Sequence, residues 1–162
     1  CPLVAQLVDR LRESGPLAVL HGADVLYLVE ERAPRRPSLV SDVGVRLPAH
    51  LTASGRAMLA ALSPAQRRAA VPLPLVTRHG DPMSPDRLRA MLATARRTGL
   101  AVEDGEVTPG LASMGVAVLD RAGWPAAALA ITFRASDDAP RNEIASQLTA
   151  TARELERRLF RG

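Results

Sequence analysis

The sequence contains no lysine, one cysteine, very few aromatic residues and no long apolar run. All 21 basic residues are arginines, and with 17 acidic residues they leave a formal net charge of +4 on 162 residues. The single cysteine, Cys1, excludes an internal disulfide and a cysteine-based metal site. Aromatic residues make up only 2% of the chain, so alanine, leucine and valine must build the core. This scarcity also argues against a nucleic-acid surface built on aromatic stacking.

The absence of long apolar stretches bears on the location of the protein. A membrane-spanning helix needs about 20 consecutive apolar residues, and no run approaches that length. No charged and then apolar leader precedes Pro2. We therefore expect a cytoplasmic domain without a membrane partner. Because the chain begins inside an amphipathic pattern, we also expect it to be a piece of a longer protein.

The composition that is present is that of one globular domain. Apolar residues make up 47% and charged residues 23%, which separates the chain from disordered sequences. The arginines occur partly as doublets, at 35–36, 67–68, 96–97 and 157–158, interleaved with acids and alanines. This pattern is typical of solvated helix and loop faces, and a nucleic-acid patch is the less favoured alternative.

Periodicity, caps and turns predict the order of the elements. A Ser-Pro-Ala-Gln capping box at 63–66, the pair Ser84-Pro85 and the glycine at 99 mark helix ends. Between 16 and 31, two short apolar runs flank a Gly-Asp turn, which predicts a β-hairpin. The expected elements are a helix over 3–11, that hairpin, a short strand within 38–48, helices over 52–62, from 63 and over 84–98, strands within 100–107, 114–120 and 125–133, and a helix over 141–160.

This order favours an α+β fold rather than alternating parallel units. The strand-to-strand connections are turns, and turns join antiparallel strands. The remaining helices must cover the sheet to bury its apolar face.

Searching for catalytic or metal-binding patterns yields little. His21, His50 and His79 lie in different elements without metal-ligand spacing. A backbone hydrogen bond is favoured over catalysis for His50. Ser54 lacks a nucleophile-elbow sequence. We therefore expect no enzyme, no metal and no cofactor.

An acidic cluster follows the strand expected after residue 100. It contains Glu103, Asp104 and Glu106. Paired carboxylates can serve acid–base chemistry, but an exposed acidic turn is the favoured interpretation.

The segment LPAHLTASGRAML, residues 47–59, permits two roles at the start of a helix. Thr52 can cap the helix. Alternatively, the free amides of the first turn can bind an anion, because Ala53, Ser54 and Gly55 are small enough to let a ligand approach. The residues alone favour capping and leave the ligand role open.

Two longer stretches resemble a known family. LPAHLTASGRAMLAALSPAQ and GLAVEDGEVTPGLASMGVAVLDRAGWPAAALAIT are similar, in order and spacing, to the two most recognisable segments of the IclR-type transcriptional regulators. The resemblance covers residues 1–162 and only the C-terminal effector-binding domain of that family. It implies a GAF-like α+β fold, a central antiparallel sheet with helices on both faces. It also implies that the N-terminal winged helix-turn-helix DNA-binding domain is absent from this chain.

The resemblance further implies a function. In such regulators a small-molecule effector, often an organic acid, modulates operator binding, and the protein forms a homodimer or homotetramer. DNA would then be contacted only through the missing N-terminal domain. The alternative from a different class is an oligomerisation or interaction module without a small-molecule ligand.

Site residues carry over only where the motifs match. We expect Leu47 and the 50–54 run to form the floor of the site and Leu39 to supply an apolar wall, with the other contacts from one loop and its facing strand. Ala112 is expected beside Ser113 in that loop. Because the expected set holds few charges, it indicates a small effector that is neutral or singly anionic. The effector-binding residues implied by the resemblance are Leu39, Leu47, His50, Ala53, Ser54, Glu103, Leu111, Ser113, Ala130 and Thr132.

Overall fold

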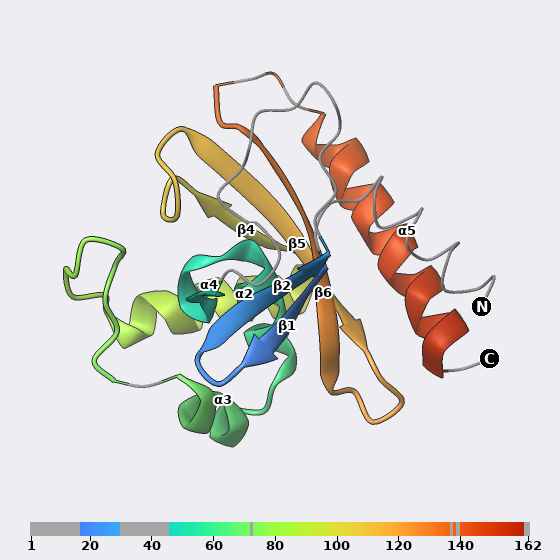
Figure 1. Ribbon diagram of the computed structural model, residues 1–162, viewed down its shortest axis with the longest axis horizontal. Helices are drawn as coiled ribbons and strands as arrows, with labels where there is room; N and C mark the ends of the chain where they lie inside the picture. The colour runs from blue at the N-terminus through green and yellow to red at the C-terminus, as the bar shows by residue number, and fades with distance from the viewer. Residues whose placement is uncertain (1–16, 30–45, 72, 137, 139, 161–162) are drawn as a thin grey trace.

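A computed structural model describes residues 17–29, 46–71, 73–136, 138 and 140–160 (Figure 1). The expected helix over 3–11, the arginine doublet at 35–36 and the candidate site residue Leu39 lie outside these ranges. Within them, the elements form one six-stranded sheet and the helices that pack on it.

All neighbouring strands of the sheet pair antiparallel. The spatial order is β3-β2-β1-β6-β5-β4, so the N-terminal hairpin joins the C-terminal strands through the pairing of β1 with β6. The predicted hairpin is confirmed over the described residues 17–29, with His21 opposite Asp24 beside its turn. The strands are β1 Leu17–His21, β2 Asp24–Val29, β3 Arg46–Pro48, β4 Ala101–Asp104, β5 Leu111–Leu119 and β6 Pro125–Arg134.

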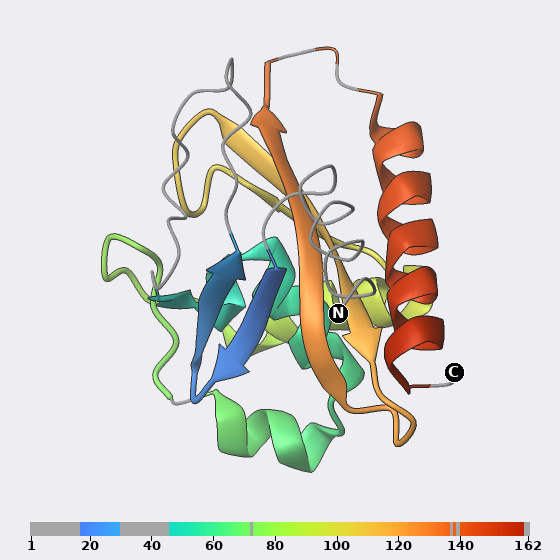
Figure 2. The same cartoon turned by 45° about the vertical axis from the view of Figure 1, so that its right-hand side comes forward.

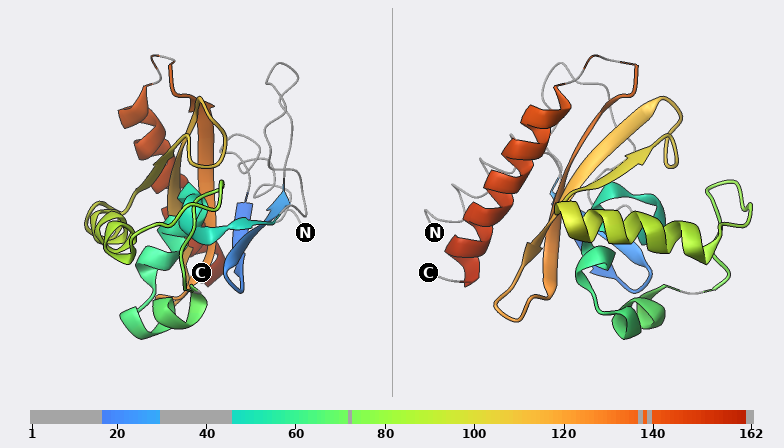
Figure 3. Two further views of the ribbon diagram at one scale, coloured as in Figure 1. Left: turned by 90° about the vertical axis from the view of Figure 1, so that its left-hand side faces the viewer. Right: turned by 180° about the vertical axis from the view of Figure 1, so that it is seen from behind.

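Helices lie on both faces of this sheet, which confirms the predicted fold class (Figures 1 and 2). One long helix, α5, packs along β5 and β6 on one face, whereas α2 and α4 cover the other (Figure 3). A short 3-10 helix, η1, precedes α2 and was not predicted. The bounds are η1 Ala49–Leu51, α2 Ala53–Ala61, α3 Pro64–Ala70, α4 Pro85–Thr98 and α5 Arg141–Phe160.

The two faces of the sheet carry separate cores because successive strand side chains point to opposite sides. Under α5, Val116 and Val118 of β5 pack with Leu148 and Leu155. On the other face, small residues of the sheet such as Ala128 face the larger side chains of the helices. Met58, Leu59 and Leu92 belong to this second core, with Ala18 and Ala128. Aliphatic residues dominate both cores, as the scarcity of aromatic residues predicts.

The predicted helix ends are mostly correct. Ser63 accepts from the Gln66 amide while the Gln66 side chain accepts from the Ser63 amide, so the predicted capping box is present. Gly99 ends α4 with a φ of 76° in the left-handed region. One prediction is wrong in its mechanism: Ser84 stands at the N-cap of α4, but its side chain forms no capping hydrogen bond. Pro85, at the first helical position, has no N–H that would need a cap.

Candidate functional site

The first turn of α2 rests directly on the middle of β5. The hydroxyl of Thr52 accepts from the Gly55 amide at 2.9 Å, so the predicted cap is present. A side chain at Gly115 of β5 would place its Cβ 2.8 Å from the carbonyl group of Ala53 and 3.1 Å from the Ser54 amide nitrogen. Only a glycine permits this approach of helix to strand. The close contact therefore positions the N-terminus of α2 over the sheet.

Polar groups at this helix start are buried without partners. Ser54 is only 1% exposed, and its hydroxyl forms no hydrogen bond. Within the described part of the chain, the amides of Ala53 and Ser54 donate to no acceptor either. A buried polar group without a partner costs about 1–3 kcal/mol. A ligand that supplied a hydrogen-bonding group here would recover that cost.

A row of three polar residues crosses the sheet on the same face. Glu103 of β4 lies opposite Ser113 of β5, and Ser113 lies opposite Thr132 of β6. The two hydroxyls are 2.9 Å apart and share a hydrogen bond. We call Glu103, Ser113 and Thr132 the polar row. Cross-strand neighbours point to one side of a sheet, so the next pair, Gly115 and Ala130, adjoins the row and leads to the α2 N-terminus.

Glu103 is buried, which contradicts the expectation of an exposed acidic turn. Its side chain is 4% exposed, and one carboxylate oxygen accepts from the Glu106 amide at 3.2 Å. Burial raises the pKa of Glu103, although hydrogen bonds from the Glu106 amide and Ser113 and the charge of Arg56 oppose the rise. Of the cluster, only Asp104 is exposed as predicted.

Replacing Glu103 with glutamine is expected to stabilise the domain more at pH 7 than at pH 4. The folded state holds the Glu103 proton more tightly than the unfolded chain does. Its contribution to the free energy of unfolding is therefore largest below the unfolded pKa of about 4.3 and is lost as the pH rises through the raised folded value. Glutamine keeps the shape without titrating. Melting curves at both pH values measure the difference, and a difference independent of pH would contradict the assignment.

Arg56 is a functional candidate that the sequence analysis missed. It is 2% exposed and donates from Nε to the His50 carbonyl at 2.8 Å and from Nη1 to the Val102 carbonyl at 3.0 Å. The same Nη1 lies 2.7 Å from a carboxylate oxygen of Glu106. The sequence did contain an indication that Arg56 is special, because it is the single charged residue in the otherwise small and apolar run over 53–61.

Glu106 connects this buried arginine to α4. Its second carboxylate oxygen accepts from Arg87 at 2.8 Å. Burial on its own would raise the pKa of Glu106, but the hydrogen bond and charge of Arg56, together with the charge of Arg87, hold that pKa below its ordinary value. Arg56 thus ties η1, β4 and the β4–β5 loop together beside the polar row. Its Nη2 is buried and has no partner.

The other predicted site residues are not all brought together. The His50 ring contacts the segment after α3, with Nε2 2.6 Å from the Val76 carbonyl. Leu47 pairs with Val25 at the far edge of the sheet, and Leu111 is half-buried at the start of β5. Ala112 was expected beside Ser113, but it lies on the opposite face of β5 because adjacent strand residues alternate.

Among the described residues, no group of three His, Cys, Asp or Glu side chains lies close enough to hold a metal ion. None of the helices in the same ranges is both long and apolar enough to cross a membrane.

The central antiparallel sheet with helices on both faces defines an α+β fold of the GAF-like type. Residues 1–157 match the family model described as the bacterial transcriptional regulator IclR C-terminal domain. The chain belongs to this family. The family is one of transcriptional regulators, so the chain is a regulatory domain rather than an enzyme.

Three relatives illustrate the similarity. The Pca regulon regulatory protein of Pseudomonas putida is 31% identical over 166 aligned residues, which cover 98% of this chain and 57% of that protein. The crystal structure of the Thermotoga maritima IclR shares 26% identity with a TM-score of 0.80, over 96% of this chain and 66% of that chain. An IclR homologue from Microbacterium hydrocarbonoxydans, complexed with 4-hydroxybenzoate, shares 25% identity with a TM-score of 0.78, over 96% and 65%. The chain therefore spans a little over half the length of the Pca regulon regulatory protein.

Proposed function

We propose that the domain binds a small organic acid between the N-terminus of α2 and the polar row, and that this effector controls a transcription factor. The observation that carries the proposal is the buried, unpartnered hydroxyl of Ser54. It lies at the start of a helix held against the sheet by the contact at Gly115. The chain shares the α+β fold of the regulatory domains of its family, which supports a regulatory use of this buried group.

The two ends of the site favour different groups of the effector. The amides of Ala53 and Ser54 lie at the positive end of α2 and suit a carboxylate. The Ser113–Thr132 pair and the buried carboxyl of Glu103 suit a hydroxyl or another neutral group. The Microbacterium homologue was solved with 4-hydroxybenzoate, a molecule with one carboxylate and one hydroxyl. That complex supports the same chemical class for this chain. Leu111 and Ala130, which lie on the same face of β5 and β6 as the polar row, would line its apolar sides.

A ligand screen tests the proposal. A true effector at about 100 times its Kd should stabilise the domain by about 2.7 kcal/mol, which raises the Tm by roughly 5–10 °C for a chain of this size. The first probes are 4-hydroxybenzoate and other small hydroxy acids, with matched uncharged amides. Ser113→Trp, which fills the space beside the polar row, should abolish the shift.

Two variants make the screen decisive. Thr132→Val removes one hydroxyl of the row without added bulk and should weaken binding even if Ser113→Trp fails to fold. Gln147→Trp adds the same bulk at an exposed position of α5 and should leave the shift intact. A shift that survives in folded Ser113→Trp and in Thr132→Val would remove the proposed site. If no acid shifts the Tm and the domain only self-associates, the chain is an oligomerisation module.

Control of transcription would follow from differential binding. The effector must bind one DNA-binding state better than the other, and operator DNA then changes effector affinity by the same factor. We propose that a winged helix-turn-helix domain outside this chain contacts DNA, and that the protein works in the cytoplasm. A homodimer or homotetramer would let two such domains meet two half-sites.

A further inference from the structure

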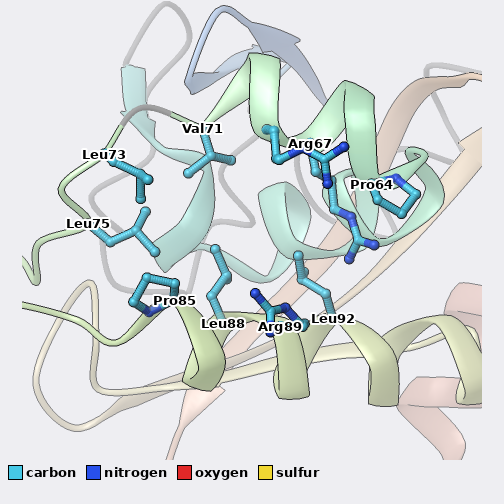
Figure 4. A pocket seen from close by; sticks show the side chains of 10 residues that line it. Pro64, Arg67, Val71, Leu73, Leu75, Pro85, Leu88, Arg89 and Leu92 are labelled. Atoms are coloured by element: carbon cyan, nitrogen blue, oxygen red, sulfur yellow. The ribbon is translucent and has the colours of Figure 1, made fainter.

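A cavity lies between α3 and α4. It has a volume of about 400 Å³ and is bounded by α3, the residues that follow it and the first half of α4. Figure 4 shows its lining at close range. We call it the α3–α4 groove. None of the residues that line it belongs to the polar row or to the first turn of α2, so the groove is a separate site.

One end of the groove is apolar. Val71, Leu73 and Leu75 come from the segment after α3, and Leu88 comes from α4 (Figure 4). Leu73 is 72% exposed, the highest value among the exposed large apolar side chains of the described residues. An exposed leucine at the rim of an apolar hollow is the kind of surface that a ligand or partner covers.

The other end of the groove is cationic, and only one of its three arginines has a carboxylate partner among the described residues. Arg67 and Arg68 from α3 and Arg89 from α4 line it. In the described ranges, neither Arg67 nor Arg68 has a carboxylate within ion-pair distance, and Arg89 pairs only with Asp86 in a largely exposed contact. The pKa of Arg67 is lowered by burial and then by the like charges of Arg96, Arg89 and Arg68. A bound anion would relieve this repulsion.

We propose that the α3–α4 groove is a second small-molecule site, for a free carboxylate that carries an aromatic ring or a short acyl chain. The apolar end receives the body of the molecule, and the guanidinium groups at the other end hold its carboxylate. Arginine suits this role because its planar fork matches both carboxylate oxygens. The volume falls within the range of about 300–1,000 Å³ that is usual for ligand sites.

The charge pattern also argues against a second copy of the chain as the occupant. In a two-fold symmetric dimer the same patch meets itself. The three arginines of one groove would then face those of the other, with only Asp86 beside each set to offset the repulsion. A small anion satisfies both ends of the groove without that repulsion.

Octanoate and octanamide provide a matched pair of probes, because they share the acyl chain and differ in charge. Isothermal titration of the full chain should show that octanoate binds at least about tenfold more tightly than octanamide. The double variant Arg67→Gln, Arg89→Gln should weaken octanoate about tenfold and leave octanamide unchanged. Arg97→Gln is the control, since Arg97 is an exposed arginine of the same helix that does not line the groove.

The remaining outcomes overturn the proposal. Equal binding of octanoate and octanamide would exclude recognition of the anion. If octanoate binding is lost in Ser113→Trp but kept in the double variant, octanoate binds at the effector site and not in the α3–α4 groove. If a second copy of the chain covered the α3–α4 groove, the protein would be a dimer and Leu73→Ser would dissociate it. Because the double variant does not touch the polar row, failure here would leave the proposed effector site standing.

Discussion

Replacing Gly55 with alanine is expected to destabilise the domain by about 3 kcal/mol, although helix propensity alone predicts a gain of about 1 kcal/mol. Gly55 lies in the first turn of α2, where η1 folds back against it. An added Cβ would lie 2.6 Å from the carbonyl carbon of Ala49 and closer still to its Cα and oxygen. The Ala49 amide is tied to the Ala23 carbonyl at 3.0 Å. Because this backbone is held on both sides, it cannot yield without breaking that hydrogen bond.

Thermal or urea unfolding measures the effect. A loss of about 3 kcal/mol corresponds to a fall in Tm of roughly 6–12 °C for a chain of this length. Ala93→Gly, on the exposed side of α4, calibrates helix propensity in the same molecule and should cost about 1 kcal/mol. A gain in stability for Gly55→Ala would show that η1 does not pack against α2 as described. It would also remove the support for the position of the α2 N-terminus over the polar row.

Removing the side chain of Arg56 is expected to have an effect of similar size. Arg56→Ala leaves the carbonyls of His50 and Val102 without their donors and leaves Glu106 with only its outer partner. Breaking a buried ion pair by deleting one partner typically costs about 3–5 kcal/mol. Glu106 is partly exposed, so we expect about 3 kcal/mol. The cost reflects a charge and two carbonyls left unsatisfied rather than the net value of the pair.

Arg87→Ala is the matched control, since Arg87 binds the same carboxylate from the exposed surface of α4. Ion pairs on the exposed surface contribute about 0–1 kcal/mol to the free energy of unfolding. The pH dependence adds a second test. The lowered pKa of Glu106 stabilises the fold above the ordinary glutamate value, and this contribution is lost as the pH falls through the lowered value. The deficit of Arg56→Ala should therefore shrink in acid. A deficit equal to that of Arg87→Ala at neutral pH would contradict the buried network.

Both variants bear on function because they act beside the proposed effector site. Arg56 and Gly55 hold the start of α2 and the β4–β5 loop in place, and Glu103 lies between that loop and Ser113. If either variant folds at low temperature, we expect it to bind effector more weakly than the native chain. Ligand-induced shifts measured below the Tm of each variant would show this loss.

Local features of the sequence predicted most of the elements. The capping box at Ser63, the glycine at 99 and the hairpin turn act through hydrogen bonds and backbone angles within a few residues. The final helix was predicted with the bounds that the structure shows, Arg141–Phe160, because an apolar stripe at helical spacing is a local feature. The η1 turn was missed, since its shape depends on the hydrogen bond from the Ala49 amide to the distant Ala23 carbonyl.

The candidate site was predictable only in part. The family resemblance pointed to Ser54, Glu103, Ser113 and Thr132, and strand register brings the last three into one row. The expected position of Ala112 was wrong because the segment is a strand and not a loop. Exposure of Glu103 and Glu106 was wrongly assigned, since the residues that bury them come from α2 and from β5.

The sequence by itself determined the order of the elements, their main caps and the family to which the chain belongs. These depend on short-range periodicity and on motifs that can be compared residue by residue. Only the tertiary structure decided that Arg56 is buried, that Ser54 lacks a partner, and that arginines of α3 and α4 meet at one end of a groove. Each of these is a relation between segments distant in the chain, and burial, hydrogen-bond satisfaction and charge repulsion are fixed by such neighbours.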